Sequence, residues 1–405
     1  MVKKILSRRK LRQQVLERLA ERGPLPADSF PIGVYFADSE VNLYQMRQWY
    51  APLRELSKTR PVLVLARTAA GAHALLEESG LDVAFVPKVN DLEAIVTEQQ
   101  LRVVFYVNQN TRNFQMMRYD RRWHVFINHG ESDKMYMTSN QFKAYDTALV
   151  AGEAARARLS RALWDYDVHA RTIAIGRPQT DHIGGAAPFT PDDRMVVFYA
   201  PTWEGDRPSA QYGSVASHGV GLVRELLRTG RHRIVYRPHP RSGVVDPAFG
   251  AANREILRLL AEANAADPAA GHIADSAPEI GWQLATANVA ICDISAMIYD
   301  RLATGLPLLV TLPAAESADV DRNGYLGECE WLRADQVSEI VPILDRAVTD
   351  EPALERLERW STWHFGDTRQ GEPTRRFHAA VETLLARWDD WDARSREENE
   401  PPAAA

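Results

Sequence analysis

The sequence is poor in cysteine and has no long apolar run, and each absence narrows the class of protein. Only Cys292 and Cys329 occur among 405 residues, and their spacing is not that of a metal-binding motif. We therefore expect no disulfide framework and a reducing, cytoplasmic environment. No apolar run approaches the roughly 20 residues that span a bilayer. The basic N-terminus also lacks an apolar stretch followed by small residues, so we expect no secretory signal.

Several enzyme signatures are absent as well. The chain has no G-x-G-x-x-G stretch, which disfavours a dinucleotide-dependent dehydrogenase, and no G-x-S-x-G elbow, which disfavours a serine hydrolase. Cysteine and histidine do not occur at metal-ligand spacing. Asp165-Tyr166-Asp167 matches the D-x-D pattern of some metal-dependent transferases, but it lies in a polar stretch away from any predicted strand end. We interpret it as solvated surface, and we expect neither a bound metal nor a cofactor.

Charge is distributed unevenly along the chain. Residues 1–22 hold eight basic and two acidic side chains, a net charge of +6, so the remainder carries -12 within the total of -6. Leu11, Val15 and Leu19 recur at helical spacing, which predicts a basic amphipathic helix. Two interpretations stay open: this helix binds the anionic inner face of the cell membrane, or its apolar side packs on its own domain. Because the rest of the chain is acidic, we do not expect nucleic-acid binding.

From residue 31 onward, short apolar strands alternate with amphipathic helices. A spacing of about 20–30 residues between strands predicts βαβ units and parallel sheets, and 405 residues suit two domains. The predicted strands are 32–36, 62–66, 83–86, 103–107, 125–127, 147–150, 173–175, 195–199, 232–236, 289–292 and 308–311. The predicted helices are 43–56, 70–78, 221–229, 278–287, 295–304, 333–349, 351–362 and 374–387.

Glycine, proline and aspartate concentrate in residues 183–194, which we interpret as a linker between two domains. Two Rossmann-like domains would hold a ligand in the cleft between them. We predict a basic amphipathic segment over 1–30, a first Rossmann-like domain over 31–182, the linker over 183–194, a second Rossmann-like domain over 195–350, helices packing back across the domains over 351–393, and a disordered acidic tail over 394–405.

Four short motifs each follow a predicted strand, which is where open α/β sheets bind ligands. They are His129-Gly130, Tyr199-Ala200-Pro201-Thr202, Arg237-Pro238-His239-Pro240 and Asp293-Ile294-Ser295-Ala296. Histidine titrates near neutral pH and is a candidate general base, and a glycine beside it lets a substrate come close. Arginine offers forked donors to phosphate oxygens, and a turn that leads into a helix N-terminus favours an anion.

Each motif also has a purely structural alternative: a helix cap at Asp293 or Ser295, or a tight turn at the other three. The prolines around His239 fix the direction of its ring, and Arg237 and Arg241 beside it favour a functional role. The ordered set of four motifs predicts an enzyme that binds a diphosphate and moves a proton.

Together the motifs resemble the CDP-glycerol glycerophosphotransferase family, which includes the teichoic-acid glycerol- and ribitol-phosphate transferases and polymerases. The resemblance runs from about residue 125 to 385. The matching positions are His129, Gly130 and Lys134; Gly176, Pro178 and Asp181; Tyr199–Thr202; Arg237, His239 and Pro240; Asp293, Ser295, Ala296 and Asp300; and Gly371–Arg376. The chain departs from the family pattern at Asn128, where many members have tryptophan, at Glu204, where arginine is common, and at Ala296, which replaces a serine.

The resemblance implies an α/β fold of GT-B type, with two Rossmann-like parallel-sheet domains facing across a cleft, the first for the acceptor and the second for the nucleotide donor. It implies that an acceptor hydroxyl attacks the β-phosphorus of CDP-glycerol or CDP-ribitol and releases CMP. The acceptor would be a lipid-linked or polymeric component of the cell wall or capsule. His129 would take the proton of the acceptor hydroxyl, and His239, the second catalytic residue, would stabilise the charge on the phosphate. The donor would be bound by Arg237, Thr202, Ser295, Ala296, Asp293, Thr374 and Arg376, while Gly130 and Lys134 would line the acceptor side. No metal is needed if these groups neutralise the diphosphate.

Two other functions remain compatible with these residues. A GT-B glycosyltransferase would use a nucleotide sugar on the same architecture, and the nucleotide that it releases would distinguish it. A catalytically inactive member would act as a scaffold for polymer assembly, but the presence of both histidines and the arginine disfavours this alternative.

Overall fold

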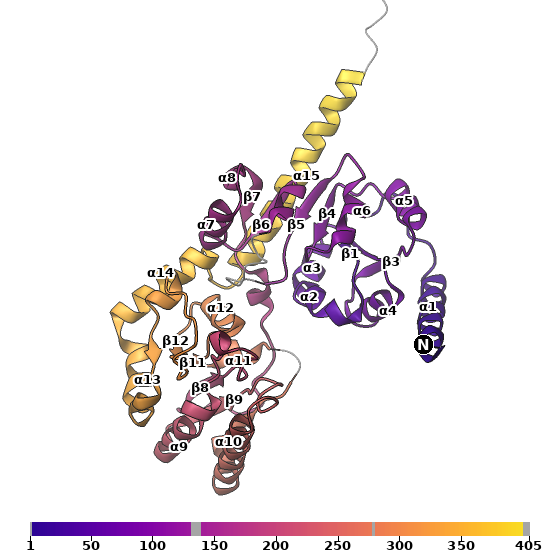
Figure 1. Cartoon of the computed structure of the whole chain (residues 1–405). Helices are drawn as coiled ribbons and strands as arrows, with labels where there is room; N and C mark the ends of the chain where they lie inside the picture. Colours follow the sequence, from indigo (N-terminus) through magenta and orange to yellow (C-terminus); the bar gives the residue numbers. More distant parts are fainter. Residues whose placement is uncertain (1, 131–138, 278–279, 400–405) are drawn as a thin grey trace, which may run out of the picture. The chain divides into compact units, whose positions relative to one another are not determined.

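The computed structural model describes residues 2–130, 139–277 and 280–399, which fold into two compact units (Figure 1). The first unit combines the residues up to His182 with those from Gln370 onward, and the second spans Ile183–Arg369. Each unit is built around one sheet of parallel strands. The predicted α/β class with two Rossmann-like domains is therefore confirmed.

The sheet of the first unit has seven strands in the order β3-β2-β1-β4-β5-β6-β7. Its central strands are buried on both faces, which is why they are continuous apolar runs in the sequence. The winding reverses between β1 and β4, and ligands of open α/β sheets bind at the carboxyl ends of such a strand pair. The strands are β1 Ile32–Phe36, β2 Val62–Ala66, β3 Asp82–Phe85, β4 Val103–Tyr106, β5 Trp123–Phe126, β6 Thr147–Val150 and β7 Thr172–Ala174.

Helices cover both faces of this sheet and close two apolar cores. Side chains of α1 to α4 and of α15 build one core, and side chains of α5 to α8 build the other. The C-terminal helix α15 therefore belongs to the first unit. The helices are α1 Val2–Arg22, α2 Leu43–Arg47, α3 Tyr50–Ser57, α4 Ala69–Glu78, α5 Val89–Glu98, α6 Phe114–Met117, α7 Glu153–Ala162, α8 Val168–Arg171 and α15 Glu372–Asn399.

The basic helix α1 packs beside α4 in the first unit (Figure 1). Val15 is fully buried in the core, and Arg18 forms an ion pair with Glu77. The packing interpretation therefore holds for the second half of this helix, while membrane binding stays a prediction. Among residues 9–14, whose side chains the structure describes, the basic side chains Arg9, Lys10 and Arg12 are exposed. Neither α1 nor any other helix in the described part of the chain is long and apolar enough to cross a bilayer.

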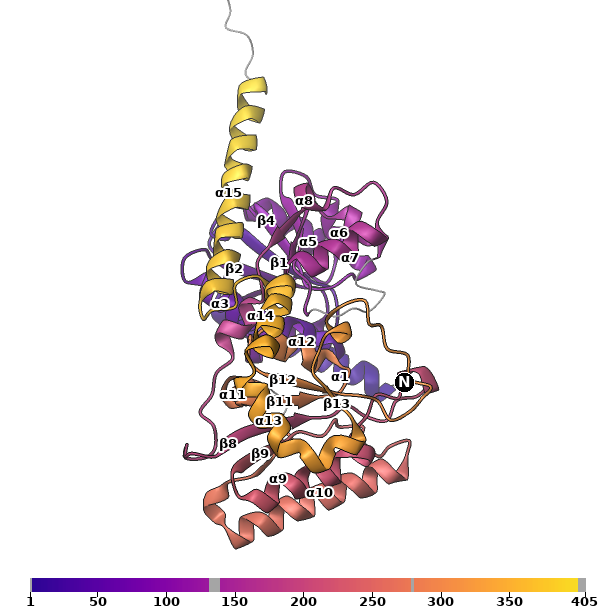
Figure 2. The ribbon, with the colours of Figure 1, turned by 90° about the vertical axis from the view of Figure 1, so that its left-hand side faces the viewer.

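The sheet of the second unit has six strands in the order β10-β9-β8-β11-β12-β13, which repeats the winding of the first sheet with its reversal between β8 and β11. Helices α9, α10 and α13 cover one face, and Figure 2 shows α9 and α10 side by side. The elements are β8 Met195–Ala200, β9 His232–Tyr236, β10 Ile273–Ala274, β11 Val289–Cys292, β12 Leu308–Thr311, β13 Trp331–Leu332, α9 Val220–Thr229, α10 Pro247–Ala266, α11 Trp282–Thr286, α12 Ala296–Leu302, α13 Ile340–Thr349 and α14 Glu351–Phe365.

Several helices differ from the sequence prediction, and α5 to α8 and α10 have no counterpart among the predicted helices. The single helix expected over 43–56 is divided into α2 and α3, because Pro52 has no N–H to donate and its ring would collide with the carbonyl of Gln48 in a continuous helix. The 20-residue helix α10 has no counterpart among the predicted helices, although Asp246 caps it and a proline follows in its first turn.

The tail predicted to be disordered over 394–405 is helical in its first part, which corrects that prediction. Helix α15 continues to Asn399. Most of its last residues are good helix formers, and Arg396 pairs with Asp392 one turn earlier at 2.6 Å, so the helix continues without a stop signal. Residues 400–405 lie outside the described residues.

Candidate active site at the carboxyl edges of the two sheets

His129 lies just past β5 in the first unit, and one backbone contact orients its ring. Its Nδ1 is 2.9 Å from the carbonyl oxygen of Val107, which can only accept a hydrogen bond. In the neutral imidazole, Nδ1 therefore carries the proton and Nε2 carries the lone pair. This is the tautomer that a general base needs. The ring of Tyr44 meets the imidazole edge-on, with ring centroids 5.8 Å apart.

The turn around His129 explains a departure from the family pattern. Asn128 has a φ of 55°, a left-handed conformation that asparagine tolerates better than most side chains. Its side-chain amide donates to the carbonyl of Gly130 at 2.6 Å, and the indole of Trp49 donates to the backbone carbonyl of Asn128. A Cβ at Gly130 would meet no described atom within 4 Å, so the space there is open. Lys134, predicted to line the acceptor side, lies outside the described residues.

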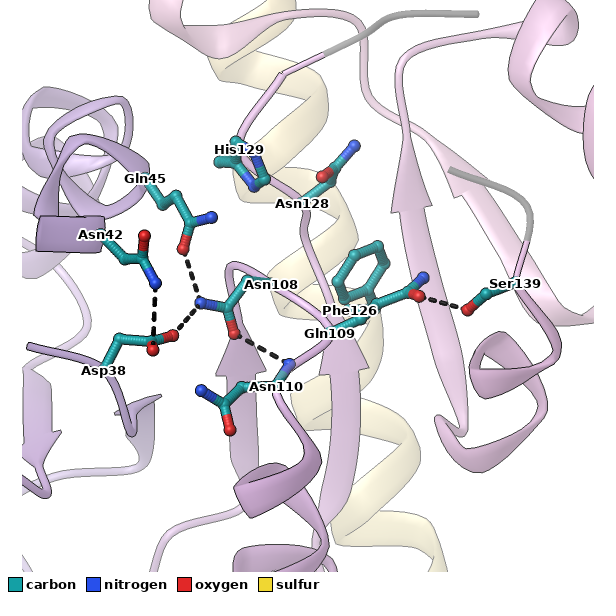
Figure 3. A pocket seen from close by; sticks show the side chains of 10 residues that line it. All are labelled: Asp38, Asn42, Gln45, Asn108, Gln109, Asn110, Phe126, Asn128, His129 and Ser139. Carbon is teal, nitrogen blue, oxygen red and sulfur yellow. Dashed lines mark hydrogen bonds between the residues drawn. The ribbon is translucent and has the colours of Figure 1, made fainter. Parts of the chain in front are cut away.

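A cavity of about 390 Å³ opens beside His129, between the loops that follow β1, β4 and β5 (Figure 3). At its centre the amide of Asn108 donates to the carboxylate of Asp38 at 2.8 Å and to the side chain of Gln45 at 2.6 Å. These bonds join the loop after β4 to the loop after β1. The carboxamides that line the cavity are Asn42, Gln45, Asn108, Gln109, Asn110 and Asn128.

Sequence reasoning missed this cavity. Its one local signal is the run Asn108-Gln109-Asn110 directly after a predicted strand. The partner of that run is Asp38, which is 70 residues away in the chain. Only the strand order, which places β4 beside β1, brings the two loops together.

Asp293 lies just past β11 and is fully buried, with 0% of its surface exposed. One carboxylate oxygen accepts the backbone N–H of Thr202 at 2.7 Å and that of Ser214 at 2.9 Å, and the other accepts the hydroxyl of Thr311 at 2.5 Å. Burial raises the pKa of Asp293 to about 6, although these hydrogen bonds favour the charged form. Asp293 therefore positions the loop that carries Thr202 from a fully buried place. Its predicted role in binding phosphate stays a prediction.

Ser295 is a helix cap, which was the structural alternative for this residue. Its hydroxyl accepts the N–H of Met297 at 3.3 Å at the start of α12. Ala296 is the first residue of that helix and is exposed. A phosphate role for these two residues, which stays a prediction, would therefore depend on their backbone N–H groups rather than on the serine side chain.

His239 follows β9 and lies in an aromatic and cationic cluster. Its Nδ1 accepts the N–H of Arg241 at 3.1 Å, so the neutral ring carries its proton on Nε2. The ring stacks on Trp203 with centroids 6.3 Å apart, and the guanidinium of Arg241 lies 3.7 Å from the Trp203 centroid. Burial and the charge of Arg241 lower the pKa of His239 below its ordinary 6.5, against the opposing charge of Glu204. At pH 7 this ring is therefore a neutral N–H donor.

Glu204 stands where the family pattern has arginine, and it has a structural task. Its carboxylate accepts the backbone N–H groups of Gly243 at 3.0 Å, Val245 at 2.7 Å and Asp246 at 3.0 Å. Burial alone would raise the pKa of Glu204, but these bonds hold the pKa below its ordinary value. The carboxylate thus fixes the loop that follows His239.

Arg237 is engaged with the protein itself. Its guanidinium pairs with Asp275 at 2.5 Å and donates to the carbonyl of Ala277 at 2.9 Å, so it joins the loops after β9 and β10. Arg241 is exposed and offers its charge beside His239. The arrangement therefore favours Arg241 over Arg237 as the residue that contacts a phosphate.

Two motifs that lie far apart in the sequence are partners in the first unit. The carboxylate of Asp181 accepts the N–H of Gly371 at 2.8 Å and that of Thr374 at 2.7 Å, so it caps α15. Among the described residues, the buried hydroxyl of Thr374 has no hydrogen-bond partner. Arg376 is half-buried on the same helix. The donor-binding roles of Thr374 and Arg376 stay predictions.

Two Rossmann-like domains, each built on a doubly wound parallel sheet, are the architecture of the GT-B class of fold. Within this class the chain is similar to the wall teichoic acid polymerase TagF, with 12% identity, a TM-score of 0.55 and 96% of each chain covered. A histidine-to-asparagine variant of TagF soaked with CDPG is similar at 13% identity and a TM-score of 0.55, over 95% of this chain and 96% of that one. UDP-GlcNAc 2-epimerase from Neisseria meningitidis bound to UDP-GlcNAc is similar at 13% identity and a TM-score of 0.54, over 88% of this chain and 99% of that one. No protein-family model and no curated protein matches the sequence.

Proposed function

We propose that this protein is a transferase that moves glycerol phosphate or ribitol phosphate from a CDP-alditol to a hydroxyl group of a cell-wall or capsular polymer, or of a lipid-linked acceptor. The acceptor oxygen attacks the β-phosphorus and forms a new P–O bond. The bond from this phosphorus to the bridging oxygen breaks, and CMP leaves. The hydroxyl proton passes to Nε2 of His129. Positioning and electrostatic stabilisation supply most of the rate enhancement in such a displacement.

The observation that carries this proposal is that the two candidate histidines are held in opposite tautomers. Val107 holds the proton of His129 on Nδ1, so the lone pair of the neutral ring is on Nε2, the basic nitrogen that the proposal assigns to the acceptor hydroxyl. Arg241 occupies Nδ1 of His239, which leaves an N–H donor on Nε2 for a phosphate oxygen. A proton acceptor and an anion-binding donor are the two groups that the transfer requires.

The similarity to TagF over 96% of both chains supports this reaction class, and the variant soaked with CDPG supports a CDP-linked donor. The fold alone does not select the reaction, since UDP-GlcNAc 2-epimerase has a TM-score of 0.54 against 0.55 for TagF. The ordered motifs favour the transferase, because they match the CDP-glycerol glycerophosphotransferase pattern from residue 125 to 385. The exposed basic side chains of α1 support a peripheral position on the inner face of the cell membrane.

The test is to identify the nucleotide that the full chain releases. The protein is incubated with a lipid-linked acceptor extracted from cell membranes and with CDP-glycerol, CDP-ribitol, UDP-glucose or UDP-GlcNAc. Release of CMP that depends on the acceptor is the expected result. Release of UDP, or epimerisation of the sugar, would overturn the proposal. Donor binding without turnover of any donor would instead support the inactive scaffold.

A further inference from the structure

The cavity at the switch point of the first sheet carries hydrogen-bonding groups that the protein does not use. The carboxylate of Asp38 accepts the amide of Asn42 at 3.1 Å, so the side-chain oxygen of Asn42 is left over. Gln109 uses only its oxygen, which accepts the hydroxyl of Ser139, and Asn110 uses only its oxygen, which accepts the N–H of Arg112 at 2.8 Å. Among the described residues, the side-chain nitrogens of Gln109 and Asn110 and the oxygen of Asn42 have no partner.

The charge of the described lining disfavours one class of ligand. No lysine or arginine lines the cavity among the residues that the structure describes, and Asp38 contributes a negative charge. A phosphate group would find no counter-charge among these described residues and would lose its hydration. A hydroxyl group both donates and accepts, so a row of hydroxyls matches a lining of carboxamides, which also donate and accept.

Aromatic side chains lie beside the carboxamides. Phe126 lines the cavity with 3% of its surface exposed (Figure 3), and the ring of Tyr44, which is 51% exposed, lies against the imidazole of His129 next to the cavity. Aromatic rings pack on the C–H groups of a polyol, while carboxamides bind its hydroxyls. The carboxamides of the cavity and the exposed ring of Tyr44 beside it therefore match the two surfaces that a sugar or an alditol presents.

We propose that this cavity binds an uncharged polyol, a sugar or alditol unit at the end of the acceptor, and that it holds one hydroxyl of that unit near His129. The side-chain nitrogens of Gln109 and Asn110 donate to the polyol, and the oxygen of Asn42 accepts from it. Assigning this polyol to the acceptor rests on the proposed function, whereas the binding of a neutral polyol does not.

Two variants remove the unused donors with little change to the bonds inside the protein. Asn110→Ser keeps a side-chain oxygen that can accept the N–H of Arg112, and Gln109→Ala gives up one contact with Ser139. Asn90→Ser is the matched control, because Asn90 is exposed on α5 and does not line the cavity. Thermal melting of the three variants checks that each is folded.

Binding to the full chain without donor is measured by saturation-transfer NMR. The probes are glycerol, ribitol, methyl glucoside, methyl N-acetylglucosaminide, glycerol 3-phosphate and inorganic phosphate. We expect at least one neutral probe to bind, with an affinity that changes less than about twofold between low and high salt. Asn110→Ser and Gln109→Ala should each weaken the binding of that probe roughly tenfold, and Asn90→Ser should not. The preferred probe distinguishes a sugar from an alditol.

Three results would overturn the proposal: no neutral probe binds, glycerol 3-phosphate binds more tightly than glycerol, or both cavity variants bind as the unmodified protein does. CMP release from CDP-glycerol is measured on the same samples. CMP release without binding of any neutral probe would contradict only the polyol site. Binding of a neutral probe without CMP release would contradict only the proposed function.

Discussion

The two sheets wind in the same order, yet the groups at their carboxyl edges differ in charge. In the first unit, the cavity between the loops after β1, β4 and β5 is lined by carboxamides and, among the described residues, by one carboxylate, Asp38. In the second unit, the loops after β8 and β9 present Trp203, His239 and the cation Arg241. Strand order thus fixes where a ligand binds, while the loop residues decide which ligand charge is favoured there. The first edge suits a neutral alcohol, and the second suits an anion.

Both units contain a carboxylate that links two loops, but the exposure of this carboxylate differs. In each unit a carboxylate links the two loops that flank the winding reversal: Asp38 accepts from Asn108 in the first unit, and Asp293 accepts from Thr202 in the second. Asp38 is partly exposed and lines a cavity, whereas Asp293 is fully buried. The same link is therefore open to a ligand in the first unit and closed in the second.

The largest effect is expected from the base at the first edge. His129→Ala should lower turnover by about 10²- to 10⁴-fold, because the proton of the acceptor hydroxyl loses its acceptor. CDP affinity should change little, since His129 is not among the proposed donor contacts. Steady-state CMP release and calorimetry measure the two quantities, and His169→Ala on the exposed surface of α8 is the control. Near-normal turnover in His129→Ala would remove this histidine from the mechanism.

The next prediction concerns Arg241, the cation at the carboxyl edge of the second sheet. Arg241→Ala and His239→Ala should each weaken CDP binding by about 10- to 100-fold, because a charged or polar donor to phosphate is worth roughly 1.5–3 kcal/mol. Arg237→Ala should lower the melting temperature first, because its guanidinium joins two loops. Calorimetric titration with CDP compares the three variants. Weaker CDP binding by Arg237→Ala at an unchanged melting temperature would reverse the assignment.

The buried link of the second unit predicts a dependence of stability on pH. The folded-state pKa of Asp293, about 6, lies above its ordinary 3.8, so the folded state holds this proton more tightly. Stability from this group is present below pH 4 and is lost as pH rises through 6. Relative to Asp293→Asn, which has no such proton, the unmodified protein should lose roughly 1–2 kcal/mol between pH 5 and 8. Parallel curves for the two proteins in urea unfolding would contradict the raised pKa.

The smallest effect concerns a second anion-facing surface, the exposed side of α1. Lys10→Gln should lower binding to anionic vesicles about fivefold, since each basic residue near such a surface contributes roughly 1 kcal/mol, and the binding should weaken with salt. The melting temperature should not change, because Lys10 is exposed while Val15 is buried. Co-sedimentation at two salt concentrations measures this. Equal sedimentation of both proteins would leave α1 with its packing role alone.

Local patterns were sufficient for most strands and for the candidate histidines. The predicted bounds of β1, β2, β6, β9, β11 and β12 match the structure, because a buried parallel strand is a continuous apolar run. His129 and His239 could be selected because each follows such a run. Helix α10 was not predicted, although its cap was visible in the sequence. The polar cavity could not be predicted, because Asp38 and Asn108 are far apart in the chain and meet only after β1 and β4 pair.

The sequence by itself determined the alternation of strands and helices, the two-sheet fold and the residue types at each strand end, because these depend on local periodicity and on short turns. Tertiary structure decided which of those residues remain available to a ligand. It buried Asp293, paired Arg237 with Asp275 and assigned Asp181 to the cap of α15. Burial and hydrogen bonding depend on partners from distant segments of the chain, and those partners meet only when the sheets have formed.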